Sequence, residues 1–194
     1  MDRNNLVTAG QTWTYLRGLV GVPIGTVFLL AGFTFLEWGP FGSLWLFWGG
    51  ILACVAAGIL VDRWYRQNYG RVSPPLGTRV RDTAWTVFGV IAVIGFAVVD
   101  SLFNLPVNGY VTAYGLMMLG YIATSIGLKL RHAVVWGGLL AAGLLPVWSG
   151  VDDVAVGLLP MGIATMVSGV LDHRVFVANL GPSRLNVESG NAGA

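Results

Sequence analysis

The chain has 194 residues and a mean hydropathy of +0.71, with 55% hydrophobic residues, only 10% charged residues and a formal net charge of +2. A water-soluble fold of this size could not cover its surface with so few charges, so the composition excludes an ordinary soluble protein and predicts an integral membrane protein. Since a membrane-spanning helix needs about 20 apolar residues, a chain of this length holds about six of them with short connections, and we expect a single membrane domain over residues 1–194.

Six apolar segments follow one another and predict an all-α bundle of six transmembrane helices. They lie near residues 18–36, 43–61, 84–99, 107–128, 133–147 and 154–171. Each is a continuous apolar run, whereas the strands of a membrane β-barrel alternate between apolar and polar residues over about ten positions. The fifth run reaches only about 22 Å as a helix, so a re-entrant fifth segment is the alternative. A short cytoplasmic tail is expected over residues 172–194.

The basic residues indicate which helix ends face the cytoplasm. All eleven Lys and Arg residues precede the first segment, follow the sixth, or lie in the second and fourth connections. Cytoplasmic loops retain Lys and Arg, so both termini of this multi-pass protein are expected in the cytoplasm. The basic residues are Arg3, Arg17, Arg63, Arg66, Arg71, Arg79, Arg81, Lys129, Arg131, Arg174 and Arg184.

Tryptophan placement predicts the same arrangement, because indole rings favour the headgroup level of a bilayer. We expect Trp38, Trp45, Trp48 and Trp148 at the outer interface, and Trp13, Trp64, Trp85 and Trp136 at the inner interface. His132 precedes the fifth segment and His173 follows the sixth, so both stand at predicted inner helix ends. They lack the paired spacing of a histidine metal motif, so an interfacial position is expected for both.

The order of the segments suggests three helical hairpins with outer turns and inner connections. Residues 63–70 align with residues 174–181, so that an Arg, an Asn and a Gly coincide and an aromatic residue, Tyr65 or Phe176, stands third. Internal repeats are common in transporters. Similar requirements at a membrane interface are the alternative explanation of the match.

The second connection carries five Arg residues and several aromatic residues. Basic residues near the inner surface attract anionic lipid headgroups, which explains this composition without a specific partner. The alternative is a docking site for a cytoplasmic or membrane protein. The candidate contact residues for either partner are Arg63, Trp64, Arg66 and Arg71. No nucleic-acid partner is expected.

Two short segments carry a family resemblance. Tyr-Arg-Gln-Asn-Tyr-Gly-Arg-Val at residues 65–72 and Leu-Asp-His-Arg at residues 171–174 resemble segments of small, uncharacterised polytopic membrane proteins of high-GC Gram-positive bacteria. The number and order of helices are also similar. The resemblance implies a bacterial inner-membrane location. It implies no catalytic residue in this chain.

Acidic residues gather at the predicted outer helix ends, namely Glu37, Asp100, Asp152 and Asp153. They could form an acidic mouth that binds cations, or an acid–base site at the membrane surface. Capping of the sixth helix, whose N-terminus favours acids, explains Asp152 and Asp153 equally well. The absence of charge from the helix centres disfavours a proton pump with a buried carboxylate relay. We therefore predict no catalytic, cofactor or metal site.

The fourth segment is the most polar of the six. Its candidate groove residues are Tyr110, Tyr114, Tyr121 and Thr124, which could line a small-molecule path or form hydrogen bonds between helices. Small residues at a spacing of four allow close helix approach. Such pairs occur at Gly21 with Gly25, at Ala53 with Ala57 and at Thr165 with Gly169, and they predict tight packing of the bundle.

Three classes of function remain open from the sequence. The leading hypothesis is a noncatalytic accessory or interaction protein, partnering a transporter or a membrane sensor, because the chain lacks a nucleotide-binding motif and a soluble domain. The alternative is a small-molecule transporter or channel that uses the fourth segment. The third is a membrane-embedded enzyme acting on a lipid or an isoprenoid, which would need the outer carboxylates or tyrosines in one pocket.

Overall fold

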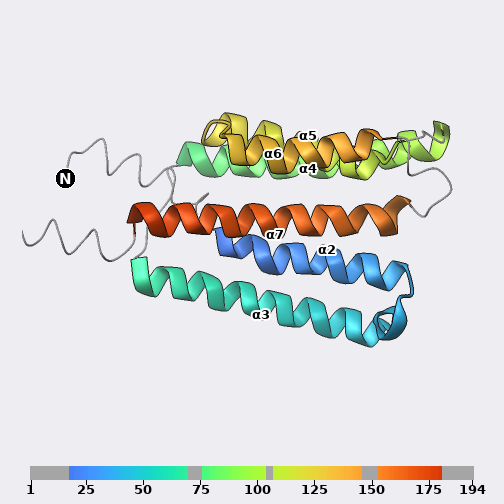
Figure 1. Ribbon diagram of the computed structural model, residues 1–194, viewed down its shortest axis with the longest axis horizontal. Coiled ribbons are helices and arrows are strands. Elements are labelled where there is room, and N and C mark those ends of the chain that lie inside the picture. The colour runs from blue at the N-terminus through green and yellow to red at the C-terminus, as the bar shows by residue number, and fades with distance from the viewer. Residues whose placement is uncertain (1–17, 70–75, 104–106, 146–152, 181–194) are drawn as a thin grey trace, which may run out of the picture.

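The computed structural model in Figure 1 describes residues 18–69, 76–103, 107–145 and 153–180. Within these ranges the chain is all helical, with six α-helices and no β-strand. The helices are α2 (Gly21–Phe35), α3 (Leu44–Tyr69), α4 (Leu76–Phe103), α5 (Gly109–Ser125), α6 (Leu130–Leu144) and α7 (Asp153–Leu180). Two short 3₁₀ turns, η1 (Gly18–Val20) and η2 (Gly39–Gly42), flank α2.

The six predicted helices are confirmed, but three of them are longer than their apolar runs. Helix α3 continues from residue 61 to residue 69, and α4 begins at residue 76 rather than 84. Helix α7 runs to residue 180, so residues 172–180 of the predicted tail continue the helix. Arg, Gln and Asp are compatible with a helix outside an apolar environment, and the apolar pattern therefore underestimated these lengths.

Within the described ranges, three helices are long and apolar enough to cross a membrane: Gly18–Phe35, Leu44–Asn68 and Val154–Ala178. Their lengths of 18 to 25 residues match the roughly 20 residues that the hydrocarbon core requires. The predicted fifth span corresponds to α6, which has 15 residues and is a shorter apolar helix.

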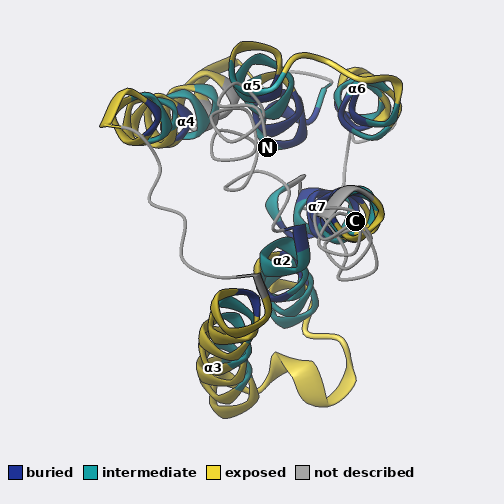
Figure 2. Cartoon of the chain, turned by 90° about the vertical axis from the view of Figure 1, so that its left-hand side faces the viewer, coloured by how far each residue is buried: buried dark blue, intermediate teal, exposed yellow. Residues whose placement is uncertain are grey.

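The helices form two layers (Figure 2). Helices α4, α5 and α6 lie in one layer, and α2, α3 and α7 lie in the other, with α7 next to α5 and α6. Helix α3 packs mainly on α2, and α4 packs mainly on α5. Helices α3 and α4 lie at the outer edges of the two layers, and their described residues do not pack against each other.

The closest helix pair is α2 with α7, and glycines make that approach possible. A Cβ atom at Gly25 would lie 2.6 Å from the carbonyl oxygen of Gly162, and one at Gly21 would lie 3.1 Å from that of Thr165 and 3.4 Å from the Cα of Gly169. Tight packing is confirmed for α2 against α7, because Gly21 lies against Thr165 and Gly169, while Gly25 lies against Gly162 and Met166.

The core lies between α5, α6 and α7 and contains Trp136 with Tyr114, Leu139 and Met161. The Trp136 side chain is 0% exposed, and its ring meets that of Tyr114 at a centroid distance of 5.7 Å. Trp136 therefore packs inside the bundle, and its place at the level of the inner membrane interface stays a prediction. Helix α6 begins at Leu130, which places Trp136 almost two turns inside the helix on the side facing α5.

One end of the assembly collects the basic helix termini. Helices α3 and α7 end there and α4 begins there, at the left of Figure 1, while the turn between α2 and α3 lies at the other end. We call it the basic end. Its described basic residues are Arg63, Arg66, Arg79, Arg81, Lys129, Arg131 and Arg174.

Candidate binding groove

An apolar groove of about 860 Å³ lies between the two layers, bordered by α2, α4, α5 and α7. It exists because α4 leans on α5 and leaves the side of α2 uncovered. The α5 wall consists of Tyr110, Tyr114, Met117, Met118 and Tyr121. Their spacing of three or four residues places them on one face of the helix.

Three of the four predicted groove residues of α5 line this space, and Thr124 does not. The Thr124 side chain is exposed, and its hydroxyl donates to the carbonyl oxygens of Gly120 and Tyr121, at 2.9 and 3.1 Å. A hydroxyl that bonds to the preceding turn of its own helix is a common local arrangement. Thr124 therefore contributes to the end of α5 rather than to the groove.

Tyr114 lines the groove and also forms a hydrogen bond between the two layers. The Thr165 hydroxyl donates to the Met161 carbonyl oxygen at 2.7 Å, so the Tyr114 hydroxyl donates to Thr165 Oγ1, at 3.0 Å. The Tyr114 ring borders the groove and also meets the ring of Phe28 on α2 at 5.4 Å. This residue thereby fixes α5 against α7 at the closed side of the groove.

Asp82 is the only charged residue among the described lining residues. It shares one face of α4 with Trp85, Thr86 and Gly89, at intervals of three, four and seven residues. The Tyr121 hydroxyl lies 3.5 Å from Asp82 Oδ1, and the rings of Tyr121 and Trp85 lie 6.4 Å apart. One acidic, aromatic corner thus stands in an otherwise mainly apolar groove, near the start of α4 and so towards the basic end.

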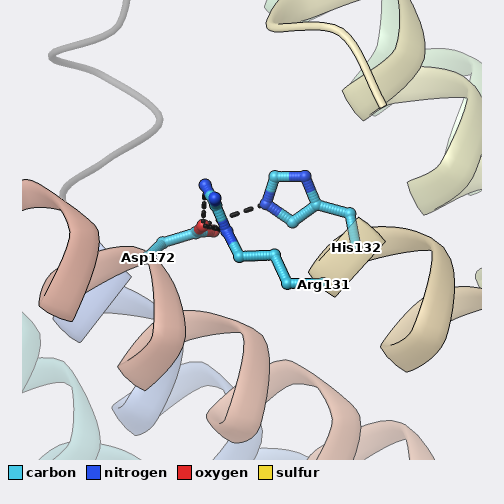
Figure 3. A network of polar contacts seen from close by, with 3 residues as sticks. All are labelled: Arg131, His132 and Asp172. Carbon is cyan, nitrogen blue, oxygen red and sulfur yellow. Dashed lines mark hydrogen bonds and ion pairs between the residues drawn. The ribbon is translucent and has the colours of Figure 1, made fainter. Parts of the chain in front are cut away.

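A charged network ties α6 to α7 at the basic end (Figure 3). Arg131 Nε donates to Asp172 Oδ1 at 3.0 Å, and His132 Nε2 lies 2.9 Å from the same oxygen. Arg131 Nη2 also lies 3.0 Å from it. The His132 side chain is nearly fully buried, at 1% exposure, and lies in the first turn of α6 at the basic end. Two donors on one oxygen give this contact between layers a strong, charge-assisted character.

This network could not be predicted from the apolar pattern. The sixth apolar run ends at residue 171, which places Asp172 at the start of the predicted tail. Because α7 continues to Leu180, Asp172 is instead a buried residue two turns inside the helix. The signal that could have revealed it is the continuation of helical spacing, with Asp172 and Phe176 both buried and four residues apart.

His173, which follows Asp172 on α7, contacts Tyr65 on α3. Nδ1 of His173 lies 2.7 Å from the Tyr65 hydroxyl, which also accepts from the backbone N–H of Leu19 at 3.4 Å. Asp172 and His173 are neighbours in sequence and hold α6 and α3 on different sides of α7.

The predicted partner-contact residues lie at the end of α3. Arg63, Trp64 and Arg66 are exposed, and Arg66 pairs with Asp62 at 2.6 Å, while Arg71 lies outside the described residues. An ion pair at this spacing on an exposed helix contributes little stability. The three described residues are thus available on the surface as a cationic and aromatic patch.

The predicted acidic mouth lies mostly outside the described side chains and stays a prediction. Glu37 is exposed after the end of α2, with a backbone φ of 51°. Asp152 and the side chains of Asp100 and Asp153 lie outside the described residues. Among the residues that are described, no group of three His, Cys, Asp or Glu side chains could hold a metal ion.

The groove has the size and lining of a small-molecule site, since such sites measure about 300 to 1,000 Å³ and combine apolar walls with a few polar groups. Its described lining offers one carboxylate and three phenols, a composition suited to binding and orientation. No protein-family model, no curated protein and no solved structure matches this chain.

Proposed function

We propose that this protein is a multi-pass membrane transporter that binds an elongated, mainly apolar small molecule in the groove. The observation that carries the proposal is the groove itself, about 860 Å³ between two helix layers, with tyrosines along one wall and a single acidic corner. Transporter sites commonly lie between helix bundles that move against each other. This was the alternative hypothesis from the sequence, and the geometry favours it over the accessory role.

The proposed setting is a bacterial inner membrane crossed six times. Three helices of suitable length and hydropathy support a membrane location. The basic end, where α3 and α7 end, is assigned to the cytoplasm, because Lys and Arg are retained on that side. In this orientation both termini are cytoplasmic, and the acidic corner of the groove lies nearer the cytoplasmic surface.

The packing supports a motion of the layers about one edge. Contacts between the layers run along α7, through Asp172 to α6 and through Thr165 to α5. On the opposite edge α4 packs mainly on α5. A rotation about α7 could therefore widen or narrow the groove at α4 while preserving these contacts, as in shear and hinge motions of packed helices.

Filling the groove tests the proposal. Ala31 lines the groove from α2, whereas Ala56 is exposed on α3 and lies outside its lining. We expect Ala31→Trp to lower binding of radiolabelled dodecyl glucoside, an uncharged single-chain probe, by roughly tenfold, since indole occupies the space of the chain. Ala56→Trp adds the same side chain outside the groove and should leave binding unchanged.

The same variants test transport. Purified wild-type protein in liposomes should give saturable uptake of dodecyl glucoside, which Ala31→Trp reduces and Ala56→Trp does not. Absence of saturable binding to the wild-type protein would contradict the proposed site. Saturable binding without uptake would restrict the function to binding and reject the transport step.

A second candidate, the accessory protein, draws support from α3. This helix packs mainly on α2 and leaves Trp45, Leu52 and Ile59 exposed, next to the patch of Arg63 and Arg66. A partner helix could cover this surface in the membrane while the patch contacts a cytoplasmic protein or anionic lipid. Arg63→Ala with Arg66→Ala should then reduce recovery of a crosslinked partner and preserve the folded bundle. A native complex without a second protein would contradict this role.

A further inference from the structure

We propose that the molecule bound in the groove has a cationic head, which the corner formed by Asp82, Trp85 and Tyr121 recognises. The chemical class is a single-chain amphiphile with an alkylammonium head. This inference rests on the proposed function, because it names the class of molecule that the same groove takes.

Charge complementarity is the first argument. Asp82 is half-buried and supplies the single formal charge among the described lining residues. Ionic interactions strengthen in an apolar environment, where the effective dielectric constant is far lower than in water. A carboxylate at the edge of such a groove therefore favours a cationic head over a neutral head and disfavours an anionic one.

The aromatic residues around Asp82 are the second argument. Trp85 lies three residues after Asp82 on α4, and Tyr121 reaches Asp82 from α5, at 3.5 Å. The two rings lie 6.4 Å apart and nearly perpendicular, at 74°. Aromatic faces attract ammonium groups, and sites for quaternary ammonium ligands combine several such faces. The corner thus offers a cation both a charge partner and aromatic surface.

The remainder of the groove suits an alkyl chain. Along α4 the lining runs from Asp82 to Ile94, which corresponds to about 18 Å at the rise of an α-helix. Beyond the corner it is formed largely by apolar side chains, among them Phe28, Val93 and Leu158. A single polar corner that continues into a single apolar groove matches a molecule with one head and one chain.

A phospholipid with an ethanolamine or choline head presents a different chemistry, because a phosphate adjoins its ammonium group. That phosphate would lie near Asp82. The neighbouring Arg81 directs Nη1 to the carbonyl oxygen of Thr124, at 3.3 Å, and Arg81 is not a lining residue of the groove. The geometry therefore favours a single-chain ammonium compound over a phospholipid head.

Equilibrium dialysis of the purified full-length protein in a non-ionic amphipol tests this inference. Wild-type protein should bind radiolabelled dodecyltrimethylammonium roughly tenfold more tightly than dodecyl glucoside, a difference within the range of a desolvated cation–aromatic site. Asp82→Asn should abolish the preference by weakening dodecyltrimethylammonium binding about tenfold, and its unfolding temperature and far-UV circular dichroism spectrum should match those of the wild-type protein, which shows that the variant is folded. Asp62→Asn removes the same charge from α3, outside the groove, and should retain the preference.

The outcomes separate the two proposals. If neither probe binds the wild-type protein saturably, the proposed function fails. If both bind equally, or if Asp82→Asn keeps the preference, the groove remains a binding site and the cationic head is rejected. If phosphatidylethanolamine added to the amphipol displaces dodecyltrimethylammonium as effectively as the unlabelled probe does, the site binds a lipid head and the single-chain assignment is overturned.

Discussion

The ring of Tyr65 on α3 packs against the ring of Phe176 on α7, with centroids 5.4 Å apart and planes at 87°. Both side chains are completely buried. They occupy the third position in the two similar sequence segments that end α3 and α7. The two segments therefore meet at the basic end through residues that the sequence alignment pairs.

Tyr65→Phe should weaken the contact between α3 and α7 by about 1 kcal/mol, the usual net value of one hydrogen bond. The substitution keeps the ring packing on Phe176 and removes only the hydroxyl that bonds to His173 Nδ1 and to the Leu19 N–H. Thermal unfolding of the purified variant measures the loss. In a double-mutant cycle with His173→Ala, additive effects would contradict a direct bond between the two side chains.

Asp172→Ala should destabilise the protein far more than an equivalent change on the surface. It leaves Arg131 and the buried His132 without their common acceptor, and breaking a buried ion pair costs about 3 to 5 kcal/mol. The matched control is Asp62→Ala, which breaks the exposed pair with Arg66 and should cost no more than about 1 kcal/mol. Equal losses in thermal unfolding would show that the network does not hold α6 to α7.

Gly25→Val should disrupt the contact between α2 and α7. A Cβ atom at this position would approach the Gly162 carbonyl oxygen to 2.6 Å, and backbone atoms cannot yield as side chains do. Overpacking of this kind costs about 1 to 3 kcal/mol or more. Gly49→Val on α3 meets no atom within 4 Å and should change the unfolding temperature little. Comparable stability of the two variants would contradict the packing described for α2 and α7.

The number and order of the helices could be predicted from the sequence because continuous apolar runs determine them. The small-residue pairs around Gly21 and Gly169 were also predictable, since their spacing of four residues indicates close approach directly. The ends of the helices were harder to predict from the sequence. Residues from Arg63 to Tyr69 and from Asp172 to Leu180 continue their helices without an apolar pattern, so the end of hydrophobicity was a poor guide to the end of the helix.

The site depended on tertiary contacts that sequence spacing does not encode. The tyrosines of α5 were recognised by their polarity within an apolar segment, and three of them line the groove. The role of Asp82 could not be predicted, because it was assigned to a connection and its position at the groove follows from the earlier start of α4. The contact of Asp172 with His132 joins residues 40 positions apart, and nothing in either segment specifies the other.

The orientation of the assembly is tested by thiol labelling in intact cells. With Cys54 replaced by Ser, single cysteines are introduced at Ser43 and Arg79, which are exposed at opposite ends of the helices. An impermeant maleimide should label position 43 from outside and position 79 only after the membrane is opened, because the basic end is assigned to the cytoplasm. Labelling of position 79 alone in intact cells would reverse the assignment.

The most direct measurement of the central claim is photo-crosslinking of a diazirine-bearing dodecyl glucoside to the purified protein, with the labelled residues identified by mass spectrometry. The account predicts labels on the groove faces of α4 and α5, around Gly89 to Val93 and Tyr114 to Met118, and their loss in Ala31→Trp. Labels confined to the exposed face of α3, around Trp45 and Leu52, and unaffected by Ala31→Trp, would contradict a binding site between the layers.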